Sequence, residues 1–325
     1  PPPPPPPPPP TPPPPAPPPP PTPDISSAAS DVYKRQVFAL VASTLWLLTS
    51  FYSIGYVRAA QERNQTRYFA AFALCLSSTI GVAFSANLIT FIVFYEILTI
   101  ATYPLVIHKE TPEAIRAGRT YLAYTLTAGV ALLAGAVWLS QVAGTLDFTP
   151  GGVFAGADAG SGTVRGLFAL LIGGVAVKAA VVPLHAWLPA AMVAPTPVSA
   201  LLHAVAVVKA GVFTVLKVVV YVFGIDLLAD TNASQWLTWV AAFTIIAASC
   251  SALGKDNLKA RLAYSTISQL SYIVLGAALA TAAGVMGGGM HIVMHAVGKI
   301  TLFFCAGAIM VGAHKTEISE MDGLG

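Results

Sequence analysis

The sequence predicts an all-α protein that crosses a membrane many times. Of its 325 residues, 55% are hydrophobic and only 10% are charged, whereas about a quarter of the residues in a soluble domain are charged. The apolar residues gather in runs that can cross about 30 Å of hydrocarbon at about 1.5 Å per helical residue. Lipid offers no partner to a backbone amide, so each run must be helical. This composition excludes a soluble globular domain.

The chain opens on a segment that cannot build a core. The first 23 residues hold 20 of the 27 prolines, and a polyproline run has no side chains for packing. Residues 26–36 (SSAASDVYKRQ) resemble translated adapter sequence. We therefore expect residues 1–36 to be a low-complexity tail outside the fold, and the first membrane helix with its loop to cover 37–66.

Nine apolar runs follow, and we expect about nine transmembrane helices. The runs are 37–57, 68–87, 88–107, 115–141, 166–189, 196–224, 236–253, 258–280 and 285–313. The second and third are almost continuous, which predicts a tight hairpin near residues 85–87.

The charges between the runs support this division. If the first loop is cytoplasmic, ten basic residues share its side: Arg58, Arg63, Arg67, Lys109, Arg116, Arg119, Lys255, Lys259, Arg261 and Lys315. The other side holds Arg165 with four acids, Asp147, Asp158, Asp226 and Asp230. This asymmetry follows the positive-inside rule and predicts a multi-pass protein of a bacterial or archaeal inner membrane.

Five charged residues lie well inside the runs, away from the loops: Glu96, Lys178, Lys209, Lys217 and Lys299. A charge near the centre of a membrane helix costs about 2.5–3.5 kcal/mol, so packing alone gives no reason to keep them. Lys217 lies about seven residues from the end of its run and could equally extend to the interface. For Glu96, Lys178 and Lys209 we favour a functional role.

Glu96 is the only acid in any run. A lone buried carboxyl group would protonate unless a cation lies on a neighbouring helix, and Lys178 is our candidate partner. Such a pair would control the proton affinity of both groups and act as a switch. Lys178 also lies five residues before Pro183, and proline should kink or break this helix beside the lysine. A plain kink is the alternative.

The last run carries His291, His295 and Lys299 at four-residue spacing. They share one helix face over about 12 Å, and histidine can both donate and accept a proton near neutrality. We interpret them as a proton relay; histidines that only bond neighbouring helices are the alternative. A zinc site is disfavoured because HIVMH lacks the following glutamate of the metalloprotease motif. His203 shares a helix face with Ser199 and not with Lys209.

The remaining composition points away from cofactors. Cys75, Cys250 and Cys305 stand alone, so no iron–sulfur, zinc or disulfide framework is encoded. The formal charge of +3 is small and forms no basic patch, which disfavours nucleic acid as a partner. We expect no cofactor and no catalytic chemistry on this chain.

At these residues the sequence resembles the antiporter-like subunits shared by complex I, the Mrp-type cation/proton antiporters and the membrane-bound hydrogenases. The segments that carry the resemblance are FYEILTIATYPLVIH, KAAVVPLHAWLPAAMVAPTPVSALLHAVAVVKAG and HIVMHAVGKITLFFCAG. The resemblance implies a Glu96–Lys178 pair, with Lys178 on a broken helix. It also implies that protons pass through Lys209 and His203 toward His291, His295 and Lys299.

The resemblance further implies inverted five-helix repeats. The first would cover 67–224, and 236–325 would begin the second, truncated one. Family members usually have fourteen helices, so two earlier and three later helices would lie outside this chain. Complex I members commonly carry an acid at the position of Ala190 and often Trp at that of Tyr95, which tilts the expectation toward the D-type subunit of the Mrp antiporters.

The sequence therefore predicts a proton-translocating subunit of a multisubunit cation/proton antiporter. Its partners would be other membrane subunits and the lipid bilayer, and it would carry protons, with sodium as a candidate coupling ion. A proton-pumping subunit of an NADH-quinone oxidoreductase or a membrane-bound hydrogenase is one alternative. A structural subunit that conducts no protons is another. A retinal-type photoreceptor and an independent carrier of organic solutes are disfavoured, the first by four buried lysines without a counter-ion in the same helix.

Overall fold

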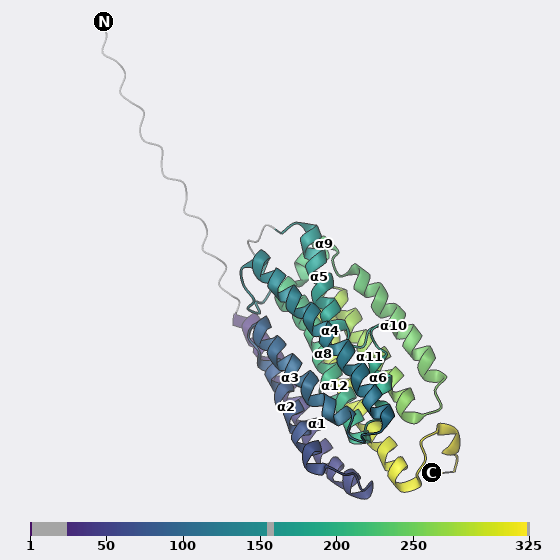
Figure 1. The fold of residues 1–325 in the computed structure, drawn as a ribbon. Helices are drawn as coiled ribbons and strands as arrows, with labels where there is room; N and C mark the ends of the chain where they lie inside the picture. Colours follow the sequence, from purple (N-terminus) through teal and green to yellow (C-terminus); the bar gives the residue numbers. More distant parts are fainter. Residues whose placement is uncertain (2–24, 155–158, 324–325) are drawn as a thin grey trace.

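The protein is an elongated bundle of helices. The structure is a computed structural model that describes residue 1 and residues 25–154 and 159–323; these ranges contain no β-strand (Figure 1). The helices are α1 (Ile25–Ala59), α2 (Gln65–Phe84), α3 (Leu88–Val106), α4 (Pro112–Ala143), α5 (Ser161–Ala176), α6 (Trp187–Ala190), α7 (Thr196–Ala204), α8 (Val207–Lys217), α9 (Ile225–Thr231), α10 (Gln235–Leu253), α11 (Leu258–Ala278) and α12 (Ala282–Ala313). The fold class expected from the sequence is confirmed.

The expected count of nine spans is not confirmed. Within the described ranges, seven helical segments are long and apolar enough to cross a membrane. The expected fifth span is interrupted, because the 16-residue α5 ends at Ala176 and helical structure resumes only at Trp187. The eighth corresponds to α11, whose 21 residues include Lys259, Arg261 and several hydroxyl side chains. The expected sixth span contains α7, α8 and the π-helix η2 (Val218–Phe223).

The proline tract (residues 2–24) lies outside the described residues. Helix α1 begins at Ile25, so it extends further toward the N-terminus than the expected start at residue 37. The guanidinium of Arg35 lies 5.9 Å from the ring of Tyr221. The proposed division between tail and fold stays a prediction.

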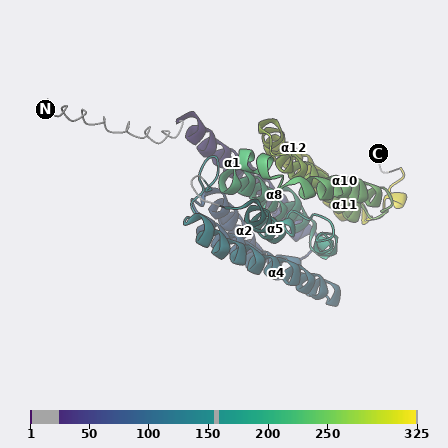
Figure 2. The same cartoon turned by 90° about the horizontal axis from the view of Figure 1, so that it is seen from above.

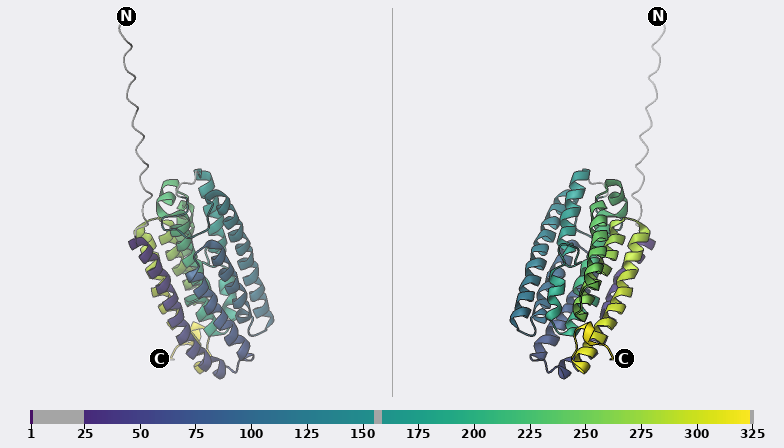
Figure 3. Two further views of the ribbon diagram at one scale, coloured as in Figure 1. Left: turned by 90° about the vertical axis from the view of Figure 1, so that its left-hand side faces the viewer. Right: turned by 90° about the vertical axis from the view of Figure 1, so that its right-hand side faces the viewer.

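The basic loops gather at one end of the bundle, which we call the charged end. The Arg67 side chain contacts Glu110 there, at 2.5 Å, and the Lys259 Nζ donates to the Ala194 carbonyl at 2.6 Å. The last described residues, which follow α12, lie at this end, and the start of α1 lies toward the opposite one (Figure 3). The structure therefore brings together loops that the sequence grouped only by charge.

Helices α4 and α12 begin and end in the same way. Each has 32 residues and a threonine N-cap: the Thr111 Oγ1 accepts from the Ala114 amide at 3.2 Å, and the Thr281 Oγ1 from the Gly284 amide at 3.1 Å. Such caps satisfy amides that the first turn leaves free. The two caps are 170 positions apart, and so are the helix ends at Ala143 and Ala313.

The same interval of 170 relates two loop contacts. The Leu88 amide donates to the Leu146 carbonyl at 2.8 Å, and the Leu258 amide to the Thr316 carbonyl at 3.0 Å. Isolated bridges pair Asn87 with Asp147 and Asn257 with Glu317. The second contact lies at the charged end and the first at the opposite end, as two inverted copies would require. The repeats at 67–224 and 236–325 stay a proposal that this correspondence supports.

Helix α8 occupies the middle of the bundle. Viewed along the bundle, it lies between the group of α2, α4 and α5 and the group of α10, α11 and α12 (Figure 2), and it packs against α2, α3, α5, α11 and α12. A side chain at Gly211 would meet the Lys178 carbonyl carbon and the Ala179 nitrogen at 2.5 Å. Only glycine lets α8 come this close to the backbone that follows α5.

Candidate functional site

Lys178 lies just after the end of α5, in a stretch without regular helix. The helix ends at Ala176, and helical structure resumes at Trp187. Pro183 falls within this interruption, so the helix breaks seven residues before the proline. The Trp187 Nε1 donates to the Val177 carbonyl at 2.7 Å, which satisfies one backbone group freed by the break. The interruption holds Lys178 in the interior with its side chain fully buried.

Lys178 contacts the residue before Glu96. Its Nζ donates to the Tyr95 carbonyl at 2.5 Å and lies 3.2 Å from the centre of the Tyr95 ring. Among the residues that the structure describes, no ion pair within 4.0 Å joins Lys178 to Glu96. Both carboxylate oxygens of Glu96 are buried without a hydrogen-bond partner. The two residues are neighbours in space, and their pairing stays a prediction.

Glu96 is held against α4. A Cβ at Gly129 would lie 2.6 Å from the Glu96 Oε1, so the glycine leaves the space that the carboxylate fills. A buried carboxylate without partners is costly unless it is protonated or meets water. The two carboxylate oxygens of Glu96 are therefore open to a hydrogen-bond partner or to water.

A second break separates α7 from α8. The amides of Val205 and Ala206 both donate to the Leu201 carbonyl, at 3.1 and 2.9 Å, and α8 starts anew at Val207. His203 lies in the last turn of α7, fully buried, and both of its ring nitrogens lack a hydrogen-bond partner. Its ring packs on Phe303 of α12, with centroids 4.8 Å apart. His203 and Lys209 therefore lie on two different helices, and their relative orientation does not follow from the spacing of one straight helix, as the sequence alone predicted.

Lys209, on the central helix α8, contacts a histidine of α12. Its Nζ lies 2.5 Å from the His295 Nδ1, and both side chains are buried. An ammonium group can only donate, so with Lys209 charged the Nδ1 accepts and the Nε2 carries the ring proton. That Nε2 is buried without a hydrogen-bond partner. The pair offers a direct contact for proton transfer between two helices.

The other two members of the relay face α11. His291 lies 2.9 Å from the Gln269 Oε1 through its Nε2, and its ring is stacked 6.0 Å from that of His295. The Lys299 Nζ donates to the Leu262 carbonyl at 3.1 Å. The structure thus places His291 and Lys299 against α11, with the His291 ring stacked beside that of His295.

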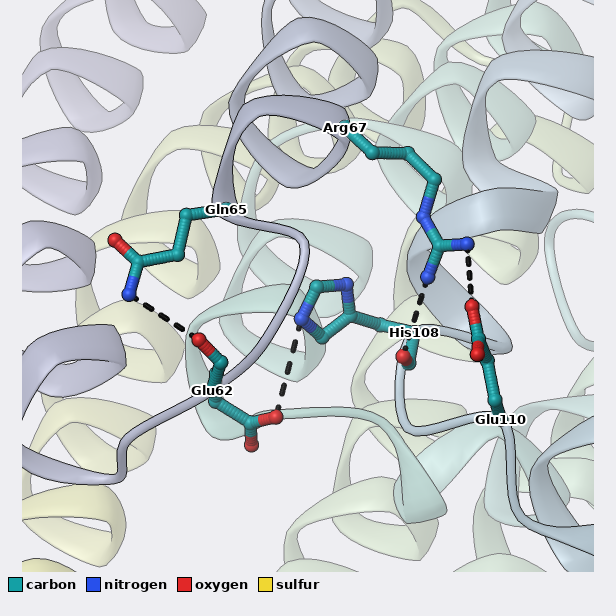
Figure 4. A network of polar contacts seen from close by, with 5 residues as sticks. All are labelled: Glu62, Gln65, Arg67, His108 and Glu110. Carbon is teal, nitrogen blue, oxygen red and sulfur yellow. Dashed lines mark hydrogen bonds and ion pairs between the residues drawn. The ribbon is translucent and has the colours of Figure 1, made fainter.

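A polar network closes the charged end (Figure 4). The Arg67 guanidinium contacts the Glu110 carboxylate at 2.5 Å and donates to the His108 carbonyl at 3.3 Å, and the His108 ring lies 3.8 Å from the Glu62 carboxylate. Burial lowers the pKa of His108 below its ordinary value of 6.5, and the Glu62 carboxylate opposes that shift. The network ties the first loop to the third.

Comparison with known proteins agrees with this arrangement. Residues 85–325 match the family model described as the NADH:quinone oxidoreductase/Mrp antiporter transmembrane region. The chain belongs to this NADH:quinone oxidoreductase/Mrp antiporter family. It is a multi-pass membrane protein.

Members of the family include two proteins that align with most of this chain. The A/B subunit of a probable K(+)/H(+) antiporter of Rhizobium meliloti is 34% identical over 299 residues, which cover 89% of this chain and 28% of the relative. The L subunit of the NADH-quinone oxidoreductase of Mycobacterium tuberculosis is 34% identical over 286 residues, 86% of this chain and 43% of the relative. The chain thus spans less than half the length of these two relatives.

A solved structure has the same fold. It is a chain of the membrane-bound sulfane sulfur reductase, an archaeal respiratory membrane complex, with a TM-score of 0.79 and 29% sequence identity. The match covers 89% of this chain and 59% of that one. The relatives are subunits of multisubunit membrane complexes.

The sequence alone missed two features of this family member. One is the break between α7 and α8, since no proline or glycine marks residues 201–208. The other is the burial of His108, which is only 4% exposed although it follows the end of α3. The acid nearest to this histidine, Glu62, comes from a different loop. No local sequence pattern indicates such a contact. The described residues contain no group of three or more His, Cys, Asp or Glu side chains that could hold a metal ion.

Proposed function

We propose that the chain is a proton-translocating subunit of a multisubunit membrane complex. One observation carries the proposal: the Lys209 Nζ and the His295 Nδ1 meet at 2.5 Å inside the bundle, across two helices. Titratable groups buried at such cost are kept for function more often than for packing. The proposal is consistent with the activities in the names of the two relatives.

The proposed route begins at Lys178 and ends beyond His295. A proton would enter from the charged end, be held at Lys178, and pass through water to Lys209. From Lys209 it would continue to His295 and on to His291 or Lys299, while His203, which packs on Phe303 of α12, would help to order water. The Glu96–Lys178 pair would act as the switch, because a carboxylate and an ammonium group attract each other when they approach.

Within this function, we favour the D-type subunit of an Mrp cation/proton antiporter, with other membrane subunits as partners and sodium as a candidate coupling ion. Tyr95 and Ala190 support this choice, because the complex I members commonly differ at these two positions. A redox-driven subunit of an NADH-quinone oxidoreductase or hydrogenase is the second candidate, favoured by the relation to the L subunit of the oxidoreductase.

The test is proton flux through the full-length complex reconstituted in sealed vesicles. Glu96→Ala, Lys178→Ala and Lys209→Leu should each abolish most driven flux while assembly stays intact. Lys315→Met, which removes a lysine of the exposed charged end, should leave the flux unchanged and is the matched control. Unchanged flux in all three interior variants would contradict the proposal and favour a structural subunit.

A further inference from the structure

Lys217 is a buried lysine that the proposed route does not use. It is the last residue of α8, and its side chain is 2% exposed. Its Nζ donates to the Ser85 carbonyl at 2.7 Å, so it does not extend to the interface. Ser85 is the C-cap of α2, and the C-terminal end of a helix carries partial negative charge. The ammonium therefore lies where a positive charge is stabilised.

Three phenylalanine rings surround this ammonium group. The Nζ lies 4.0 Å from the ring centre of Phe148, 5.6 Å from that of Phe91 and 5.8 Å from that of Phe213. The quadrupole of a ring attracts a cation and gives a neutral amine no comparable attraction. The rings and the helix end thus both surround the Nζ with groups that attract a cation.

The Phe148 ring belongs to a strap, residues 146–153, that crosses the end of the bundle opposite the charged end. On one side the strap is bonded to the α2–α3 turn: the Leu88 amide donates to the Leu146 carbonyl at 2.8 Å, and the Phe148 amide to the Ala86 carbonyl at 2.9 Å. These bonds hold the strap directly beside Ser85.

On its other side the strap is bonded to η2. The Thr149 amide donates to the Tyr221 carbonyl at 3.2 Å, and the Val153 amide to the Val222 carbonyl at 2.9 Å. Gly152 has a φ of +100°, and a Cβ there would meet the Phe223 carbonyl carbon at 2.5 Å. Only glycine allows the strap to lie this close to the end of η2.

We propose that Lys217 and the strap form a seal that stops protons from leaving along α8. This inference rests on the proposed function. Lys209 and Lys217 are eight residues apart, about 12 Å along the helix, so a proton held at Lys209 has a short way to this end of the bundle. A fixed cation in a poorly hydrated site repels an arriving proton, because Coulomb repulsion is strong where the dielectric constant is low. Protons at Lys209 are thereby directed sideways to His295.

The experiment measures passive proton leak in the full-length complex, reconstituted in vesicles with a trapped pH-sensitive dye, after an external acid pulse and without a driving ion. Lys217→Met removes the charge and keeps the chain length, and should raise the leak about tenfold, equivalent to about 1.4 kcal/mol of barrier. Lys217→Arg keeps the charge and should stay near the wild-type leak. Lys315→Met removes a lysine at the other end and should not leak.

Two further variants separate a seal from a general loss of structure. Phe148→Leu alters only the partly exposed ring of the strap and should leak in the same direction to a smaller extent. Adding Lys209→Leu to Lys217→Met should return the leak to the wild-type level, because the path to the seal is then interrupted.

The seal is overturned if neither Lys217→Met nor Phe148→Leu raises the leak, if Lys217→Arg leaks as much as Lys217→Met, or if the double variant still leaks. Driven flux of Lys209→Leu alone tests the proposed function separately. A loss of driven flux in that variant without any leak in Lys217→Met refutes the seal and leaves the proposed function standing.

Discussion

The Lys209 Nζ and the His295 Nδ1 lie 2.5 Å apart, and neither residue is near the other in sequence. Lys209 reaches this position because α8 starts anew after the break at residues 205–206, and because Gly211 lets α8 pack against the backbone beside Lys178. With Lys209 charged, the contact makes the two side chains unequal: the lysine brings the cation, and the histidine is its acceptor.

This inequality predicts different effects on stability. His295→Leu leaves a buried cation without its acceptor and should lower the free energy of unfolding by about 1–3 kcal/mol. Lys209→Leu removes the buried cation altogether and should cost little or nothing. Thermal unfolding of the detergent-solubilised complex measures both. Equal losses of stability in the two variants would contradict the assigned roles.

Gly211 should tolerate no larger residue. In Gly211→Ala the new methyl group would meet the backbone at Lys178 and Ala179 at 2.5 Å, and overpacking of this kind costs about 1–3 kcal/mol. Gly289→Ala is the matched control on α12, because nothing lies within 4 Å of its Cβ position, and alanine favours a helix over glycine by about 1 kcal/mol. The unfolding temperature should therefore fall in Gly211→Ala and rise in Gly289→Ala. An unchanged unfolding temperature in Gly211→Ala would refute the close approach of α8 to this backbone.

The two asparagine caps should contribute similarly to the helices they begin. The Asn87 Oδ1 accepts from the Thr90 amide at 2.8 Å, and the Asn257 Oδ1 accepts from the Ala260 amide at 3.0 Å. Replacing either by alanine should cost about 1 kcal/mol and speed hydrogen exchange of the first turn.

Asn257→Ala should have the larger effect, since the Asn257 Nδ2 also donates to the Glu317 carboxylate at 2.9 Å. Ser234→Ala is the control, because the Ser234 side chain makes no cap bond to α10. Equal exchange rates in the cap variants and in this control would show that the caps contribute nothing.

His108 should make stability depend on pH below neutrality. Burial lowers its pKa in the folded protein, so below about pH 6.5 the unfolded chain binds a proton that the folded protein resists. Stability from this residue is therefore present above about pH 6.5 and is lost as the pH falls. The groups that face it are Glu62, Arg67, Lys109 and Glu110.

The measurement is the change in unfolding temperature between about pH 7.5 and pH 5.5, in the wild type and in His108→Leu. The variant should lose less stability over this interval, because it has no histidine to protonate. A variant that loses as much as the wild type would show that Glu62 already compensates for burial at His108.

Much of the fold could be predicted because hydrocarbon imposes simple rules. Long apolar runs located seven spanning segments, and the charges of the loops grouped residues that the structure places at one end. The predicted count of nine spans is not confirmed at α5 and α11, where a broken helix and polar side chains depart from those rules. The candidate residues Glu96, Lys178, Lys209 and the three on α12 could be chosen for their cost in lipid.

The composition and pattern of the sequence determined the helical class, the approximate limits of the helices and the buried ionisable residues, since each depends on the residue itself and its near neighbours. Only the tertiary structure decided which of them meet: Lys178 lies against Tyr95, Lys209 against His295 and Lys217 against Ser85. These contacts join residues between 83 and 132 positions apart, and they depend on helix breaks and glycine contacts that are set by packing across the whole bundle. No local pattern along the chain encodes that packing.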